Sequence, residues 1–474
     1  MRINRLRRRP VFHIIMYHTG EGDPGEMRLK KTMFLAVLLA FFFLLPVSRA
    51  ETLQPCHQVT NSAKTTTQSN KSQIRLWQVE TAFPAVTEEI NGLAGAWAEE
   101  LGPALPKAGN NGKKNSRLDV EIRYSRTGLH WMSFLVQART TYHQKLTGQR
   151  FTTRTYDMET GEQILLSDLF DDDSEIWDLL SGRVRQALTD YWPDVQPDAA
   201  KLESLCSREV LEQADFTLHG MSLVLHYPAE TLYPEKYTLM EVTFFYPEIR
   251  EWMTETALAE TNNLAYYKTC ALTFDDGPSA KNTAKVLDSL METGARATFF
   301  VIGNRIKDNR ALVQREHDNG HAVAAHNWHH GNVTKSTGAA LRAMPKKVND
   351  AMIKSIGIPV RYDRVPGGRY PRMVEVKVGW AYIQWSLDTY DWRGISTAEV
   401  MRKVRKKIHD GDIILCHDIK DHTPESARQI VRYLEEEGYM LLTVDELFAK
   451  DGVELEPNKV YYRCDQGDTS IRKD

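Results

Sequence analysis

Residues 270–278 read CALTFDDGP, an apolar run followed at once by two aspartates, a glycine and a proline. The apolar part predicts a buried strand, and the Asp-Asp-Gly-Pro sequence predicts its end. Successive side chains at a strand end point in different directions, so one carboxylate can bind a metal while the other acts as a base. The alternative is a solvated Asp-Asp-Gly-Pro turn, which the apolar residues in front of Asp275 disfavour.

A regular alternation surrounds this stretch. Apolar runs lie at 270–274, 297–302, 321–325, 360–364, 381–387, 412–417 and 439–443, and amphipathic stretches at 279–292, 339–356, 397–409 and 423–437. Strands that alternate with helices indicate parallel βαβ units. Seven strands are too many for most open sheets, so the pattern favours a β/α-type barrel that is one strand short of eight.

Polar motifs follow four of the other predicted strands. They are HNWHH (326–330), RVPGG (364–368), DTYDW (388–392) and HD (417–418). In β/α barrels the catalytic groups come from the carboxyl ends of several strands. We therefore expect these motifs and Asp275-Asp276 to meet at one rim of the barrel.

The first of these motifs contains candidate metal ligands. His326 and His330 are four residues apart, so on a helical turn they share one face, while His329 is the competing partner of His326. Together with a carboxylate from another strand, two histidines make a ligand set that suits Zn²⁺ or another borderline divalent ion. Calcium is disfavoured because it prefers ligands that are all oxygen.

Two further residues have alternative interpretations. His417 is either a satisfied core histidine or a general acid whose pKa a nearby carboxylate raises. Arg364 is either a surface charge or a guanidinium that holds a carboxylate bidentately. Four aromatic residues either pack or stack on sugar rings: Trp328, Trp385, Tyr390 and Trp392.

The five motifs resemble the motif series of the NodB-type polysaccharide deacetylases, carbohydrate esterase family 4. They occur in the order TFDDGP (273–278), HNWHH, RVPGG, DTYDW and LCHD (415–418). The resemblance covers about 268–448. It implies an α/β fold, a distorted (β/α)7-type barrel, preceded here by a smaller α+β domain. It also implies a divalent metal, usually zinc, and removal of N-acetyl groups from peptidoglycan or chitin, or of O-acetyl groups from xylan.

The resemblance assigns roles to individual residues. Asp275 would be the general base, oriented by Arg364. The metal ligands would be Asp276, His326 and His330. His417 would be the general acid, tuned by Asp391. The oxyanion and acetyl pocket would be formed by the backbone N–H of Gly367 and the side chains of Trp392 and Leu415.

The chain departs from the family pattern at four positions. Asn327 replaces a serine or threonine, Gly331 a proline, Val365 a proline and Gly367 an often aromatic residue. None of these changes removes a reacting side chain. They bear on the shape of the pocket and the choice of substrate.

The amino terminus has the layout of a targeting segment. Residues 33–45 read MFLAVLLAFFFLL, preceded by basic residues and followed by Ser48-Arg49-Ala50. This order predicts a secretory signal peptide within 1–50, with translation starting at Met27. An uncleaved signal anchor is the alternative. The apolar run is shorter than the roughly 20 residues of a membrane-spanning helix, so we expect no permanent span.

The rest of the chain divides into further predicted segments. Residues 51–72 read as a polar linker, 73–255 as an α+β domain with alternating strands, and 449–474 as a C-terminal tail. The 73–255 segment weakly resembles a domain found before such deacetylases and in lysozyme-sensing anti-sigma factors, which implies a role at the cell wall. We therefore expect a secreted, wall-associated peptidoglycan deacetylase.

The alternatives to this function are a chitooligosaccharide deacetylase or acetylxylan esterase, and a non-catalytic wall-binding or sensing protein.

The composition is typical of a globular protein, with 474 residues of which 42% are hydrophobic and 26% charged. A net charge of −3 disfavours nucleic acid as a partner. Five cysteines without a CxxC pair disfavour a zinc ribbon.

Overall fold

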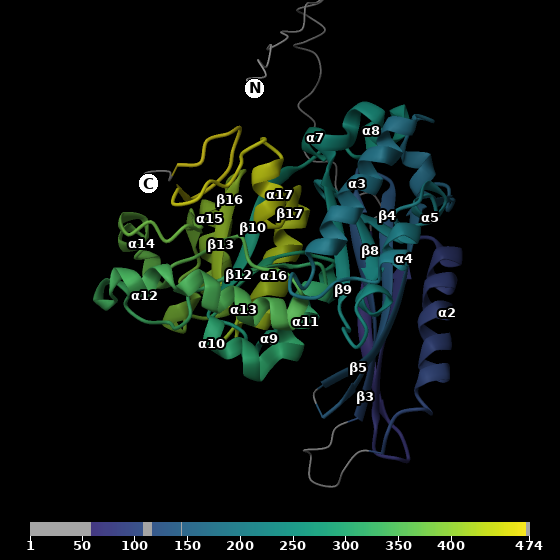
Figure 1. Cartoon of the computed structure of the whole chain (residues 1–474), viewed down its shortest axis with the longest axis horizontal. Helices are drawn as coiled ribbons and strands as arrows, with labels where there is room; N and C mark the ends of the chain where they lie inside the picture. The colour runs from purple at the N-terminus through teal and green to yellow at the C-terminus, as the bar shows by residue number, and fades with distance from the viewer. Residues whose placement is uncertain (1–57, 108–115, 144, 471–474) are drawn as a thin grey trace, which may run out of the picture. The chain divides into compact units, whose positions relative to one another are not determined.

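The computed structural model describes residues 58–107, 116–143 and 145–470 (Figure 1). The predicted signal peptide, the expected start at Met27 and the choice between cleavage and anchoring concern residues outside these ranges. Among the residues described, none of the helices is long and apolar enough to cross a membrane.

A parallel sheet forms the carboxyl-terminal part of the fold. Its strand order is β15-β16-β10-β11-β12-β13-β14-β18, and β17 pairs with β10. The strands are β10 (Lys268–Asp275), β11 (Thr298–Val301), β12 (Ala322–Ala325), β13 (Tyr362–Asp363), β14 (Ala381–Ile383), β15 (Leu387–Asp388), β16 (Asp412–His417), β17 (Tyr439–Leu442) and β18 (Val460–Tyr461). The predicted α/β class with a distorted barrel is confirmed.

Amphipathic helices connect these strands and cover the sheet. The longer ones are α9 (Thr283–Thr293), α11 (Arg310–Asp318), α13 (Met344–Ile356), α15 (Thr397–Lys407) and α16 (Thr423–Glu436). In α9 the apolar side chains of Val286, Leu287 and Leu290 are fully buried. The helix ends at Gly294, whose φ of 67° is left-handed and therefore favours glycine. The predicted alternation of strands and helices is confirmed.

Two expectations for this part need correction. The apolar run 381–387 forms two short strands, β14 and β15. The segment 449–474 is not simply a tail, because β18 within it pairs in parallel with β14. Tyr461 and Cys464 are buried there, so this segment contributes to the core.

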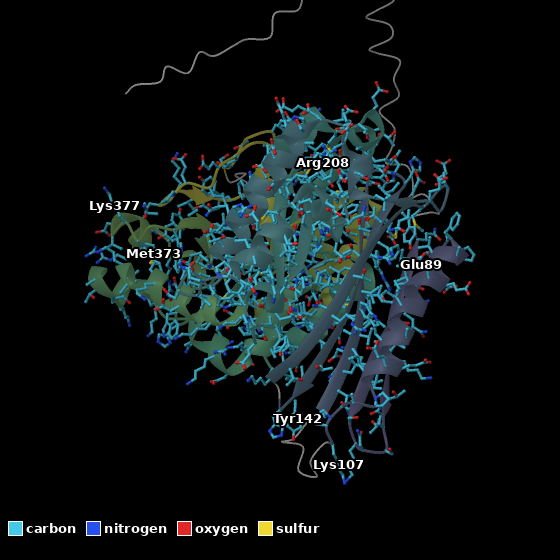
Figure 2. The ribbon with its side chains drawn as sticks, turned by 45° about the vertical axis from the view of Figure 1, so that its right-hand side comes forward. Glu89, Lys107, Tyr142, Arg208, Met373 and Lys377 are labelled. Atoms are coloured by element: carbon cyan, nitrogen blue, oxygen red, sulfur yellow. The ribbon has the colours of Figure 1, made fainter. Side chains whose placement is uncertain are left out.

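A six-stranded sheet forms the amino-terminal part of the described chain, in the order β1-β2-β3-β4-β5-β6. The strands are β1 (Val59–Thr67), β2 (Gln73–Thr81), β3 (Ser116–Thr127), β4 (Trp131–Tyr142), β5 (Lys145–Asp157) and β6 (Gln163–Ile164). Helix α2 (Pro84–Leu101) packs along the sheet, and Tyr142 lies at the tip of the β4–β5 hairpin (Figures 1 and 2). The predicted strands at 118–124, 132–138 and 151–156 are confirmed.

The predicted polar linker 51–72 is wrong over β1. This strand pairs antiparallel with β2 along its whole length. Its threonines are β-branched and suit a strand. Asn61 is buried and its Nδ2 donates to the carbonyls of Ile122 (2.7 Å) and Met291 (3.0 Å). A polar composition therefore belongs here to an ordered edge strand.

A smaller sheet, β7-β8-β9, follows helix α3 (Ser174–Asp190) in the chain. Its strands are β7 (Phe216–Leu218), β8 (Ser222–Pro228) and β9 (Leu239–Phe245). The apolar face of α3, including Leu180 and Val184, packs in the same core as Leu223 and Phe244 of this sheet. The helical spacing predicted over 176–188 is confirmed.

Buried ion pairs join the six-stranded sheet to the helices of the barrel. Glu121 of β3 is 1% exposed and accepts from Arg139 of β4 and from Arg315 Nε of α11 at 2.9 Å. Arg315 also donates to Asp288 of α9 at 2.7 Å. Asp288 in turn pairs with Arg75 of β2 at 2.7 Å. Charges of the six-stranded sheet therefore pair with charges of helices α9 and α11 where the two parts meet.

Glu121→Ala is expected to lower the free energy of unfolding by about 3–5 kcal/mol, because it leaves two buried guanidinium groups without their carboxylate. The loss would be read from urea unfolding. Glu100→Ala is the matched control, since the Glu100–Arg150 pair is largely exposed and its loss should leave the midpoint unchanged. Equal midpoints for the two variants would contradict the assignment.

Candidate functional site

The five polar motifs lie at the carboxyl ends of neighbouring strands. β10 ends at Asp275, β13 precedes Arg364, β15 ends at Asp388 and β16 ends at His417. His326 directly follows β12, and its backbone N–H donates to the carbonyl of Val301 at the end of β11. Because these strands are parallel, the motifs share one edge of the sheet.

Asp275 is held by a fully buried arginine. The Nη1 of Arg364 donates to Asp275 Oδ1 at 2.8 Å and to Thr273 Oγ1 at 2.7 Å. The same guanidinium donates to the carbonyls of Ile383 and Gln384, each at 3.0 Å. The surface-charge interpretation of Arg364 is therefore wrong. Its hydrogen bonds fix one oxygen of Asp275 and leave Oδ2 on the side of His326, 3.9 Å from Nε2.

Asp276, His326 and His330 form a group that could hold a metal ion, with ligand atoms within 4.8 Å of one another. Asp276 Oδ1 lies 3.4 Å from His326 Nε2 and 3.2 Å from His330 Nε2. His326 Nδ1 contacts the carbonyl of Arg364, which commits Nδ1 to that bond and leaves Nε2 free as a ligand. In the described chain, His329 is not part of this group.

The backbone brings these ligands together without a helical turn. Residues 326–330 are irregular, and Asn327 adopts a left-handed φ of 57°. The backbone N–H of Asn327 donates to Asp363 Oδ1 at 2.9 Å, which stabilises this turn. The expectation that His326 and His330 share one face of a helical turn is therefore wrong, although their side chains do converge.

The electrostatic environment of Asp276, His326 and His330 favours a bound cation. Burial opposes ionisation of Asp276, but the His326 contact and the neighbouring histidines outweigh it and lower the pKa of Asp276 to about 2. Burial likewise disfavours His326 in its charged form, but Asp275 and Asp276 together raise its pKa. Asp276 Oδ1 is a buried acceptor without a hydrogen bond among the described residues. Nitrogen and carboxylate donors around such an atom fit a borderline divalent ion.

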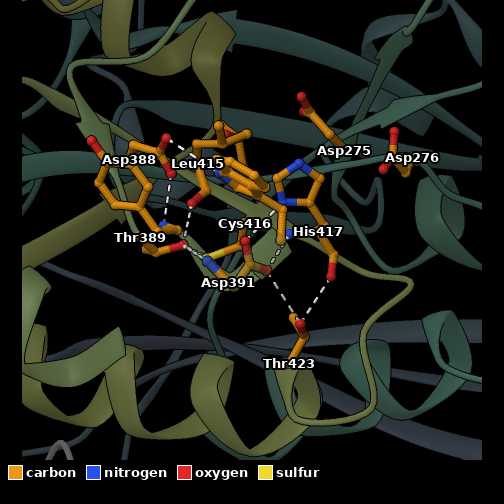
Figure 3. A network of polar contacts seen from close by, with 12 residues as sticks. Asp275, Asp276, Asp388, Thr389, Asp391, Leu415, Cys416, His417 and Thr423 are labelled. Atoms are coloured by element: carbon orange, nitrogen blue, oxygen red, sulfur yellow. Dashed lines mark hydrogen bonds and ion pairs between the residues drawn. The ribbon is translucent and has the colours of Figure 1, made fainter. Parts of the chain in front are cut away.

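His417 is held by a buried carboxylate on the opposite side from Asp275 and Asp276 (Figure 3). Its Nδ1 lies 2.7 Å from Asp391 Oδ1, and its backbone N–H donates to Asp391 Oδ2 at 2.7 Å. Burial disfavours the imidazolium, but the hydrogen bond with Asp391 and the surrounding carboxylates raise the pKa of His417. The imidazole can therefore carry a proton on Nε2 towards the rim.

The three remaining predicted site residues lie on the same edge. Gly367, in the turn Pro366–Gly368, has a φ of 64°, a left-handed conformation that favours glycine. Trp392 is 45% exposed beside Asp388, and Leu415 of β16 is buried. An exposed indole next to a buried polar site can wall a pocket and meet a ligand.

Two buried carboxyl groups near the site had no role in the sequence predictions. Burial raises the pKa of Asp363 to about 7, and the pKa of Asp418 to a similar value. Asp418 follows His417 in the LCHD motif, and Asp363 precedes Arg364. In the sequence, only their position next to motif residues indicated that they lie near the site. The identity of a single aspartate does not predict whether it is buried.

Comparison with known proteins identifies the family of this chain. Residues 265–380 match the family model for polysaccharide deacetylase. The peptidoglycan-N-acetylmuramic acid deacetylase PdaA of Bacillus subtilis is 31% identical over 196 residues, which are 40% of this chain and 74% of that protein. The matched region includes the strands and loops that carry Asp276, His326 and His330. The chain belongs to the NodB-type polysaccharide deacetylases, carbohydrate esterase family 4.

Other relatives match over part of their length. The peptidoglycan-N-acetylglucosamine deacetylase PgdA of Listeria monocytogenes is 37% identical over 208 residues, and the match spans less than half of each protein, 44% of this chain and 43% of PgdA. Among solved structures, a family 4 acetyl xylan esterase from Clostridium thermocellum in complex with a cobalt ion is 30% identical. The match covers 41% of this chain and 98% of that one, with a TM-score of 0.40.

Proposed function

We propose that the protein is a metal-dependent deacetylase that hydrolyses the N-acetyl groups of peptidoglycan amino sugars and releases acetate. The observation that supports this most strongly is the presence of two hydrogen-bonded polar pairs at the same strand ends as one candidate ligand group. The Arg364–Asp275 pair offers a base, and the Asp391–His417 pair offers an acid. Hydrolysis of an amide needs both, a base for the water and an acid for the leaving nitrogen.

Asp276, His326 and His330 would hold the metal, for which Zn²⁺ is the best fit to two imidazoles and one carboxylate. When bound, such an ion supplies a Lewis acid that polarises a carbonyl and lowers the pKa of water. Asp276 and His326 are already oriented for this task, by the carboxyl edge of β10 and by the carbonyl of Arg364.

Asp275 would take the proton of the attacking water at Oδ2. Arg364 keeps Oδ1 occupied at 2.8 Å, so the free oxygen faces the ligand group. The guanidinium also fixes the direction of the carboxylate, because three other acceptors hold it in place. The backbone N–H of Gly367 would stabilise the negative charge that develops on the acetyl oxygen.

His417 would protonate the departing amine at Nε2. Asp391 accepts from Nδ1, which orients the ring and stabilises its charged form. Trp392 and Leu415 would enclose the acetyl methyl group. The products are acetate and a free amino sugar, whose amine adds positive charge to the glycan when it is protonated.

Asp391→Asn is expected to move the alkaline limb of the kcat–pH profile to lower pH. The general acid works below its pKa, and Asp391 raises the pKa of His417. An amide in its place lets that pKa fall, so the imidazolium is lost at lower pH. Asp388→Asn is the comparison: in the described chain Asp388 accepts from the backbone N–H of Tyr390 and is not hydrogen-bonded to His417, so its loss should shift the limb less than the loss of Asp391. An unshifted limb in Asp391→Asn would contradict the role of His417.

Peptidoglycan is proposed as the substrate because the named relatives PgdA and PdaA are peptidoglycan deacetylases. The amino-terminal sheet would then serve on the wall, and the protein would act outside the cytoplasm. A division into an amino-terminal domain and a barrel domain remains part of this proposal, with the expected bounds 73–255 and 268–448 extended to include β1 and β18.

The test is acetate release from purified peptidoglycan by the full chain, with and without a chelator, followed by addition of zinc. Release that is lost with chelator and restored by zinc is the expected result, and mass analysis of the product would identify the sugar. Release only from chitooligosaccharide or acetylxylan would overturn the substrate and keep the chemistry. No release from any of them, with binding to the glycan, would favour a wall-binding role.

A further inference from the structure

A buried carboxylate next to the acid joins the two loops that carry the reacting groups. Asp418 follows β16 and is fully buried. It accepts a hydrogen bond from the hydroxyl of Thr283, the first residue of α9. The Thr283 oxygen in turn accepts from the backbone N–H of Ser279 at 2.7 Å. Since that N–H can only donate, the hydroxyl proton of Thr283 points to Asp418.

The same carboxylate packs directly on the backbone of Gly277. A Cβ at this position would lie 2.4 Å from Asp418 Oδ2 and 2.8 Å from Oδ1, closer than real Cβ contacts. Gly277 is not among the residues with positive φ, so the need for glycine here comes from the close approach of Asp418. The peptide of Gly277 is also fixed from its other side, because its carbonyl accepts from the N–H of Ile302 at 2.8 Å.

A second set of hydrogen bonds joins the same loops. Asn282 Nδ2 donates to the carbonyl of Ile419 at 2.8 Å and to Asp421 Oδ1 at 3.0 Å. The segments 277–283 and 418–421 therefore contact each other through buried polar groups as well as through exposed ones.

The segment needs this support because of the residue in front of it. Asp276 has a φ of 75°, a left-handed conformation that a non-glycine residue rarely adopts. Backbone of this kind persists only where the surrounding structure holds it. Gly277, the residue that follows Asp276, lies against Asp418 and is held through its carbonyl by the backbone N–H of Ile302.

We propose that Asp418 is a positioning residue, which acts with Thr283 to hold the 276–283 loop so that the carboxylate of Asp276 faces His326 and His330. In the described chain, the hydrogen bond and the close packing contact of Asp418 are with Thr283 and Gly277 and not with Asp276, His326 or His330. It holds the backbone that aims one ligand, and it lies beside the acid His417. The inference rests on the proposed metal-dependent function.

The test is zinc affinity, measured by competition with a chelator, in the full chain without substrate. Asp418→Ala and Thr283→Val are each expected to weaken zinc binding by about 10–100-fold, the usual effect of losing a group that orients a metal ligand. Thr283→Ser keeps the hydroxyl and should restore the affinity of the unchanged protein. Glu425→Ala is the control, because Glu425 lies just beyond the same loop and its carboxylate accepts from Arg428 and Gln429 of its own helix α16.

Thr283→Val is close in shape to threonine, so a folded variant is expected, and circular dichroism would establish it. A folded Thr283→Val variant with unchanged zinc affinity would overturn the inference. So would equal losses in Thr283→Val and Thr283→Ser. A protein that binds zinc with this pattern but releases no acetate would instead refute the proposed function and leave the positioning role intact.

The contact between Gly277 and Asp418 gives a second measurement. Gly277→Ala should weaken zinc binding in the presence of Asp418, because the new methyl group collides with the carboxylate. In the Asp418→Ala background the same methyl group has room, so the two losses should be less than additive. Fully additive losses would show that the glycine and the aspartate act independently and would contradict the inference.

Discussion

Replacing Asp275 by asparagine is expected to reduce kcat by about 10²–10⁴-fold, the usual contribution of a general base. Asparagine keeps an oxygen for Arg364 Nη1, so the buried guanidinium retains its hydrogen bond. It has no basic oxygen on the side of the ligand group, so the attacking water keeps its proton. The measurement is acetate release under saturating substrate, with KM determined in parallel.

The metal content separates this effect from a loss of the ion. Asp275 is not among the three ligands, so Asp275→Asn should bind zinc with affinity close to that of the unchanged protein. A variant that hydrolyses at the normal rate would refute the assignment of Asp275 as the base. A slow variant that has also lost zinc would assign Asp275 to the metal site instead.

His330→Ala is expected to abolish metal-dependent acetate release. It removes one of three ligands, and two protein ligands are fewer than catalytic zinc sites generally use. His330 is about half exposed, so the fold should tolerate alanine. The loss would appear both as a failure to bind zinc in the chelator competition and as release at the background rate.

His329→Ala is the control for this change. His329 is the neighbouring exposed histidine and the competing ligand by sequence spacing, yet it lies outside the group that could hold an ion. Its replacement should leave zinc affinity and rate unchanged. If His329→Ala and not His330→Ala lost zinc, the ligand assignment would have to be exchanged between the two.

The strand-end pattern was the most informative part of the sequence. Each polar motif followed an apolar run, and in a parallel sheet such positions share one edge. The meeting of these motifs at one edge could therefore be anticipated from their order, whereas the pairing of Asp275 with Arg364 and of Asp391 with His417 was expected from the family resemblance. The distances between these side chains depend on how they pack, and the order of the motifs does not predict that packing.

Local backbone choices were harder to predict. The spacing of His326 and His330 suits a helical turn, but Asn327 takes a left-handed conformation that a hydrogen bond to Asp363 stabilises. The threonine-rich residues of β1 suggested a linker because they are polar. Their sequence does not reveal that β2, on the other side of a turn, pairs with them. In both cases contacts with another segment decided between two locally acceptable conformations.

The pairing of buried Glu121 with the largely buried Arg315 has a consequence for the salt dependence of the structure. Dissolved ions screen exposed charges over a distance of about 10 Å at 0.1 M and about 3 Å at 1 M, but they screen buried pairs much less. The exposed pair of Glu100 and Arg150 should therefore weaken as salt is added, while the pair between Glu121 of the six-stranded sheet and Arg315 of α11 persists. The six-stranded sheet and the barrel should keep their mutual orientation from dilute buffer to concentrated electrolyte.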